Sequence, residues 1–77
     1  MTTQILSLKA GDTITLNGKT FTVNADAQEA THCILVGIVG RRGGEKCLCW
    51  YPAQNAGHYF SMSAMARSTN IKSISIA

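Results

Sequence analysis

The sequence has few charged residues and no apolar run long enough to cross a membrane. Only 14% of its 77 residues are charged, against roughly 25% in an average soluble domain. The longest apolar stretch, 33–39, is far shorter than the ~20 residues that a membrane-spanning helix needs. The first residues carry no basic leader, so a signal peptide is not expected. We therefore expect a cytoplasmic protein with no membrane partner.

The chain is also too short for a large enzyme. A domain of this size buries only about 60% of the surface that its unfolded chain exposes, and it holds a single hydrophobic core. A two-domain enzyme and a repeat array are therefore excluded. Disorder is not expected either, because 45% of the residues are hydrophobic and the net charge is only +3. We expect one small β domain over residues 1–77.

The cysteines are too few and too poorly spaced for a disulfide framework. Their number is odd, and two residues that lie two apart on a strand, as Cys47 and Cys49 do, are about 6.5–7 Å apart. Reduced thiols in a cytosol are the simpler interpretation. Cys33, His32 and His58 add further possible metal ligands, but the spacing lacks the short knuckle of a zinc site. Core packing is expected and no cofactor is predicted, although the sequence leaves metal binding by these five residues open.

Nucleophilic catalysis by a cysteine and a histidine is conceivable, with Cys33 or Cys49 beside His58. Such a site needs a third group that orients the imidazole and a cleft that holds the substrate. The nearest carboxylate in the sequence is Glu45, and a chain of this length has little material for a cleft. We therefore expect no enzymatic activity.

The clearest structural signal is a β-hairpin around Asn17-Gly18. This dipeptide favours a two-residue turn, because both positions tolerate positive φ. Such a turn pairs Leu16 with Lys19 and places the apolar residues of both strands on one face. These apolar residues are Ile14, Leu16, Phe21 and Val23. The turn at 9–12 followed by this hairpin resembles the opening of small barrels of the Sm, Tudor and KOW kind, a likeness of backbone geometry that transfers no functional residue.

Other segments with strand character predict a mostly β fold. Residues 6–8, 31–39, 45–51 and 71–76 are interpreted as strands, with 31–39 buried on both faces, and 40–44 as a turn. Residues 24–30 favour a short helical turn, and 58–67 are compatible with either a strand or a helix. We expect a small antiparallel β-barrel or a strongly bent sheet of five to six short strands, with at most one or two short helical turns.

The most suggestive functional feature is the basic turn at 41–46. Residues 40–77 carry five basic residues against Glu45 alone, a net charge of +4, whereas residues 1–39 have a net charge of −1. Arg41, Arg42 and Lys46 are the predicted binding residues. Trp50 and Tyr51 complete the predicted site, but they point to opposite faces of a strand, so only one of them can lie beside the turn.

Two functions fit this pattern. The first is a non-enzymatic binding module, a small phage- or mobile-element-type protein that binds and inhibits a host protein complex. The protein partner that it contacts is expected to be acidic. The alternative is a small nucleic-acid-binding β-barrel that uses the basic turn on phosphates. Strand faces rich in threonine carry little charge that would prevent association, so a homo-oligomer is also expected.

Overall fold

The computed structural model describes residues 2–76, and of residues 64–66 it describes the backbone alone. The chain opens with one short helix, α1 (Thr2–Leu6), and a 3-10 helix, η1 (Pro52–Gln54), joins the fifth and sixth strands. The strands are β1 (Thr13–Leu16), β2 (Lys19–Val23), β3 (Gln28–Glu29), β4 (Ile34–Val39), β5 (Glu45–Tyr51), β6 (Ala56–Ser61), β7 (Ala64–Asn70) and β8 (Ile74–Ile76). Within the described residues, no helix is both long and apolar enough to span a bilayer.

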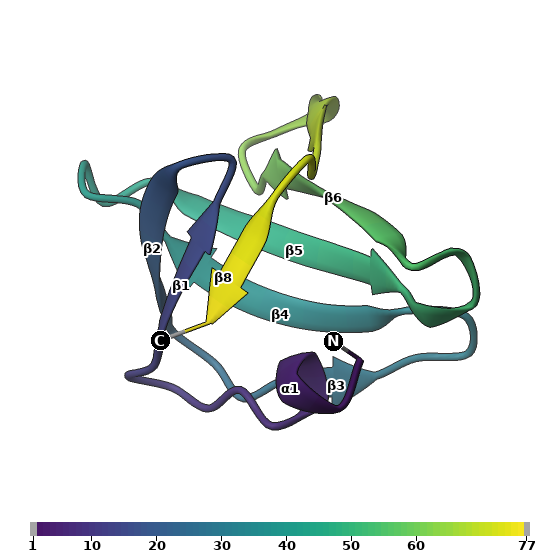
Figure 1. The fold of residues 1–77 in the computed structure, drawn as a ribbon. Helices are drawn as coiled ribbons and strands as arrows, with labels where there is room; N and C mark the ends of the chain where they lie inside the picture. The colour runs from purple at the N-terminus through teal and green to yellow at the C-terminus, as the bar shows by residue number, and fades with distance from the viewer. Residues whose placement is uncertain (1, 77) are drawn as a thin grey trace.

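The strands form one antiparallel sheet that is bent but not closed. The strand order is β7-β6-β5-β4-β2-β1-β8, with β3 paired to β4 beside β2. Figure 1 shows the bend: β1, β2 and β8 cross in front of β4, β5 and β6. The predicted mostly β, antiparallel fold is therefore confirmed, whereas a closed barrel does not form, because β7 and β8 remain the two edges of the sheet.

The predicted hairpin is confirmed in its turn and in its register. Leu16 pairs with Lys19 and Ile14 with Phe21. Asn17 and Gly18 adopt φ angles of 51° and 80°, the left-handed conformation that this turn type requires. The apolar side chains of both strands are buried on one face, as the alternation predicts.

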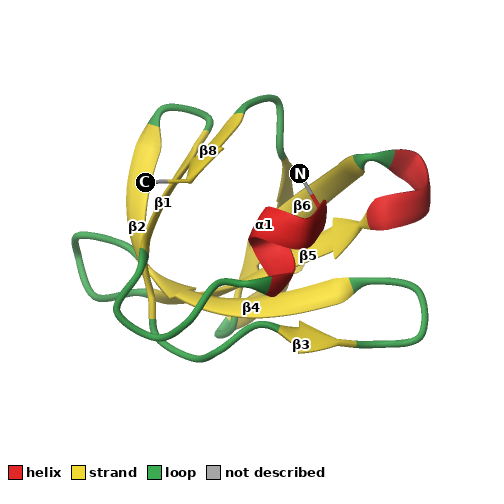
Figure 2. Cartoon of the chain, turned by 60° about the horizontal axis from the view of Figure 1, so that its bottom comes forward, coloured by secondary structure: helices red, strands yellow, loops and turns green. Residues whose placement is uncertain are grey.

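The core fills the space between the two layers of the bent sheet. It contains the buried residues of β1 and β2, and from the other layer Ile34, Val36, Ile38, Leu48, Trp50 and Tyr59. The helix α1 lies at one end of this space (Figure 2) and adds Ile5, which is fully buried. The N-terminal segment therefore covers an opening that the sheet alone leaves between its layers.

Two segments adopt structures other than those predicted. The strand expected at 6–8 does not form; residues 2–6 are helical, so that Ile5 and Leu8, three residues apart, both reach the core while Leu6 is 39% exposed. The helical turn expected at 24–30 is a loop that ends in β3, because the edge of β4 offers Ile34 and Leu35 as pairing partners. In both segments the tertiary contacts outweigh a weak local preference.

The remaining predictions concern the strands after residue 30. The strand at 45–51 and the turn at 40–44 are confirmed. Residues 34–39 alternate between buried and half-buried, so this strand is buried on one face rather than on both. The segment 58–67, which was compatible with a strand or a helix, forms strands: it lies in β6 and β7, with a turn between them. With β3, this division raises the number of strands to eight, above the five to six expected.

Candidate functional site

A groove opens between β2 and the layer formed by β5, β6 and β7. It has a volume of about 930 Å³ and includes residues from β2, the β4–β5 turn, β5, β6 and β7. We call it the basic groove, because its rim carries the basic side chains of Lys19, Arg41, Arg42 and Lys46. It is large enough for several side chains of a partner.

The groove exists because β2 and β4 separate after two residue pairs. Thr22 pairs with Val39 and Val23 with Ile38, but the chain then leaves β4 at Gly40. The turn that follows is closed by a hydrogen bond from the Gly43 N–H to the Gly40 carbonyl, with a φ of 80° at Gly43. The first half of β2 therefore has no neighbour on this side, and the turn residues Arg41 and Arg42 stand beside it.

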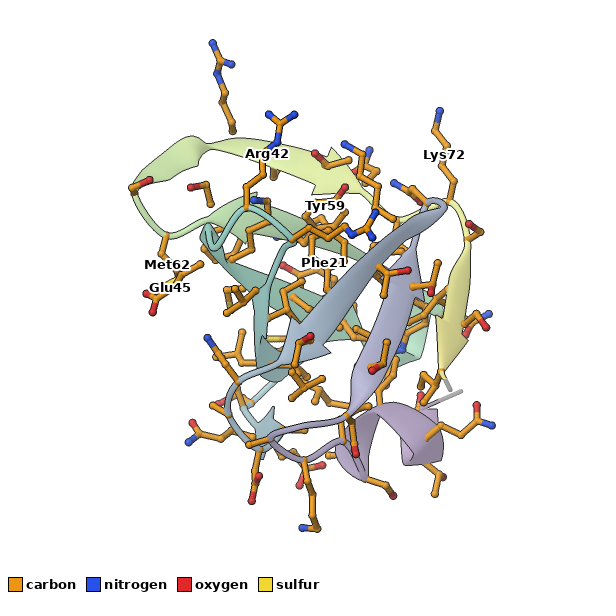
Figure 3. The ribbon with its side chains drawn as sticks, turned by 90° about the vertical axis from the view of Figure 1, so that its left-hand side faces the viewer. Phe21, Arg42, Glu45, Tyr59, Met62 and Lys72 are labelled. Atoms are coloured by element: carbon orange, nitrogen blue, oxygen red, sulfur yellow. The ribbon has the colours of Figure 1, made fainter. Side chains whose placement is uncertain are left out.

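Two aromatic rings form the floor of the basic groove. The rings of Phe21 and Tyr59 pack at a centroid distance of 5.4 Å and are only 3% and 5% exposed. This contact joins the two layers of the sheet below the basic rim, as Figure 3 shows with Arg42 above Tyr59 and Phe21. The floor is therefore rigid and apolar, but it offers little aromatic surface to a ligand.

A second hollow continues the basic groove along β7. It has a volume of about 650 Å³, shares Thr69 with the basic groove, and carries Lys72. The two hollows together hold five of the seven lysines and arginines of the chain. None of the four acidic residues lines either hollow; Asp12 and Asp26 accept hydrogen bonds from the backbone of the 9–10 segment instead. Positive charge is thus concentrated on one side of the molecule.

The structure brings together three of the five predicted site residues. Arg41 and Arg42 are exposed on the turn, and Lys46 lies half-buried at the inner face of β5. Trp50 is 4% exposed and belongs to the core. Tyr51 lies on the outer face of β5, five residues and therefore about 16 Å beyond Lys46. Neither aromatic residue of the predicted site borders the basic groove.

Sequence reasoning missed Lys19 and Lys72 as members of the same surface. Lys19 follows the Asn17-Gly18 turn, and its strand comes from the half of the sequence with a net charge of −1. The charge difference between the two halves pointed only to residues after 40. The separation of β2 from β4, which places Lys19 opposite the turn at 40–44, has no local signal in the sequence.

The outer face of β5 carries thiols and aromatic rings. The rings of Tyr51 and Phe60 lie on either side of His58, at centroid distances of 5.5 and 5.9 Å from it. Cys33 and Cys49 are close enough to share a hydrogen bond, which raises the pKa of the Cys33 thiol above its ordinary value, with burial as a second cause. The same kind of contact with Cys49 raises the pKa of the Tyr51 hydroxyl.

The thiol of Cys47 also differs from a free thiol. Burial is the largest cause that raises its pKa, and the nearby Cys49 is the second. Within residues 2–76, no three His, Cys, Asp or Glu side chains converge on a point where a metal ion could bind. A hollow of about 390 Å³ lies beside His32, Cys33 and Tyr51.

The geometry defines a small, open antiparallel β-sheet protein with a basic groove. Comparison of the chain with protein-family models, with curated proteins and with solved structures gave no significant match. The function is therefore argued from the basic groove itself.

Proposed function

We propose that the protein is a non-enzymatic binding module whose basic groove receives an acidic segment of a protein partner. The observation that carries this proposal is the rim of four cations around a groove that no acidic residue of the described chain lines. Complementary charge accelerates association and selects among partners. A polypeptide segment rich in carboxylates has the charge that complements this basic rim.

The floor of the groove favours a protein over a nucleic acid. Proteins that bind single-stranded nucleic acids combine a basic track with exposed aromatic rings on which the bases stack. Here Phe21 and Tyr59 are almost fully buried below the rim, and Trp50 lies in the core. A strand of nucleic acid would therefore contact cations but find no ring for its bases.

Nucleic-acid binding remains the second candidate function because of the turn itself. Arg41 and Arg42 are exposed on a turn that contains Gly40, Gly43 and Gly44. Guanidinium groups in such a position suit phosphate oxygens, which they bind in a bidentate manner. The expected consequence is affinity that falls steeply with salt and depends little on the nucleotide sequence.

The biological setting extends this proposal. A small binding module without catalytic groups fits a phage- or mobile-element-type protein that inhibits a host complex by covering an acidic surface of it. The three cysteines are free thiols, which fits a reducing compartment such as the cytoplasm. In the same proposal, copies of the chain associate through the uncharged threonine side chains of β1 and β2.

The decisive experiment removes the two arginines of the turn. Arg41→Ala with Arg42→Ala should weaken binding of a short glutamate-rich peptide by roughly tenfold, because two charge contacts are lost. The thermal midpoint should stay almost unchanged, since both side chains are exposed. The matched control is Lys9→Ala, which removes a cation outside the groove. Equal affinity of the double variant and the wild type would refute a groove-based function.

Oligothymidine distinguishes the two candidate partners in the same assay. If the protein binds acidic protein segments, the glutamate-rich peptide should bind and oligothymidine should compete weakly. Tight, salt-sensitive binding of oligothymidine that disappears in the double variant would instead establish the nucleic-acid function.

A further inference from the structure

The strand β7 is an edge of the sheet and borders both basic hollows. Its residues 67–70 are exposed, and Thr69 lines the basic groove and the hollow that carries Lys72. Arg67 adds a further cation on the same strand. An exposed edge strand is a template for pairing with another extended chain.

The register shows which backbone groups of β7 face outward. Asn70 pairs with His58, and the Ile71 N–H donates to the Gly57 carbonyl at the next pair. Antiparallel pairs alternate between bonded and non-bonded, so the N–H and C=O groups of Ser68 and Asn70 point away from β6. In agreement, the Asn70 carbonyl accepts a hydrogen bond from the Asn17 Nδ2, outside the sheet.

The edge of β7 is only partly protected against pairing: Arg67 carries a charge, the register shifts beyond Phe60, and Asn17 bonds to the Asn70 carbonyl. Native edges are protected by short strands, by charged or proline residues, or by bulges. The other edge strand, β8, contains only three residues and β3 only two, whereas β7 contains seven. The run Ser68-Thr69-Asn70 carries neither charge nor proline, and its regular pairing continues to Phe60 before the register shifts.

We propose that an extended acidic segment of the partner adds to β7 as a further strand and directs alternate carboxylates toward the basic groove. This inference rests on the function proposed above and specifies how the segment binds. The outward N–H and C=O of Ser68 and the outward N–H of Asn70 supply its hydrogen bonds, since the Asn70 carbonyl is already bonded to Asn17. Side chains alternate between the two faces of a strand, so every second residue of the segment shares the face of Thr69, which lines the groove.

The charge at this edge selects the partner over a second copy of the chain. If two copies paired through β7, two basic edges would lie side by side, each with Arg67 and with Lys72 close to its end. The positive charges on two paired edges would repel each other. An acidic segment replaces this repulsion by attraction, and any homo-oligomer would use another surface.

Synthetic peptides test this mode of binding. A short peptide of alternating glutamate and threonine should bind more tightly than a peptide of the same composition with its glutamates in one block. N-methylation of one alternate set of residues should weaken binding by about tenfold, because it removes the donors that face β7. N-methylation of the other set should have little effect. Equal affinity for all four peptides would refute strand addition.

Variants of β7 give the complementary test. Ser68→Pro removes an outward N–H without touching the ladder to β6 and should weaken the alternating peptide, whereas Ser68→Ala keeps the N–H and should bind normally. If Ser68→Pro lowers the thermal midpoint, the N-methylated peptides decide alone, since they leave the protein unchanged. If sedimentation shows dimers for the wild type but monomers for Ser68→Pro, the edge of β7 binds a second copy of the chain and the inference is wrong.

The failure of this inference can be told apart from that of the proposed function. If the double variant at residues 41 and 42 loses the peptide while N-methylation has no effect, the groove binds acidic segments but no strand is added. If the double variant binds every peptide as the wild type does, the proposed function itself is wrong.

Discussion

The two faces of β5 differ in chemistry although their residues alternate along one strand. The inner face carries Lys46 at the rim of the basic groove, followed by Leu48 and Trp50 in the core. The outer face carries Cys47 and Cys49 beside the rings of Tyr51, His58 and Phe60. The inner face therefore combines buried packing with one wall of the basic groove, while the outer face carries thiols and aromatic rings. The proposed binding surface lies where the core opens to solvent.

The largest expected effect tests the assignment of these two faces. Leu48→Ala should lower the free energy of unfolding by about 2–5 kcal/mol, because the side chain is fully buried and its loss leaves a cavity. The neighbouring change Cys47→Ala should cost less than about 1 kcal/mol, since that side chain is half-buried on the outer face. Urea unfolding of both variants measures the difference. A greater loss of unfolding free energy for Cys47→Ala than for Leu48→Ala would show that the inner and outer faces of β5 are assigned the wrong way round.

An intermediate effect is expected at Asn17, which connects the hairpin to the end of β7. Its Oδ1 accepts hydrogen bonds from the Lys72 and Ser73 N–H groups at 2.6 and 3.2 Å, and its Nδ2 donates to the Asn70 carbonyl at 2.9 Å. Asn17→Ala should cost about 1–3 kcal/mol, since these bonds are lost and φ stays at 51°.

The control for Asn17 separates backbone strain from hydrogen bonding. Asn17→Gly also loses the side-chain bonds but accepts positive φ without strain, so it should be destabilised less than Asn17→Ala. Both variants should weaken binding of the alternating peptide, because the end of β7 is released from the hairpin. Normal peptide binding by both variants would show that the groove does not depend on this contact.

The smallest effect concerns the thiols of the outer face. Because the pKa values of Cys33 and Cys47 are raised, alkylation by iodoacetamide at neutral pH should be slower than in the protein unfolded by urea. The folded state holds these protons more tightly than the unfolded state. The stability that this contributes is present below the unfolded pKa and is lost as the pH rises through the raised pKa. Mass spectrometry of alkylated thiols measures the rate. Alkylation of the folded protein as fast as that of the unfolded protein would contradict the raised pKa values.

Local features of the sequence were sufficient for the elements whose partners are close in the chain. The Asn17-Gly18 turn sets both the register of β1 and β2 and their buried face. The glycine-rich turn at 40–44 sets the pairing of β4 with β5. The same turn exposes Arg41 and Arg42, so part of the binding surface could also be predicted. In each case a short loop fixes the geometry, because it holds the two strands that it joins side by side in one register.

Elements with distant partners were mispredicted or left open, because the local sequence does not specify which strand they pair with. Residues 2–6 are too short to be stable as an isolated helix and depend on the burial of Ile5. Residues 28–29 form a strand only because β4 offers an edge. The division of 58–67 into β6 and β7 depends on pairing with β5. Local preference was weak in all three segments, so the tertiary environment decided their structure.

By itself the sequence determined that the protein is small, mostly β and basic in its second half, because composition, alternation and turn residues are local properties. Only the tertiary structure decided that the sheet stays open, that Lys19 joins the turn at the basic groove and that Lys72 lies in the adjoining hollow. It also decided that Trp50 belongs to the core rather than to the basic groove. These outcomes depend on where β2 separates from β4 and on how β7 ends beside Asn17. Both are contacts between residues far apart in the chain, and no local pattern specifies them.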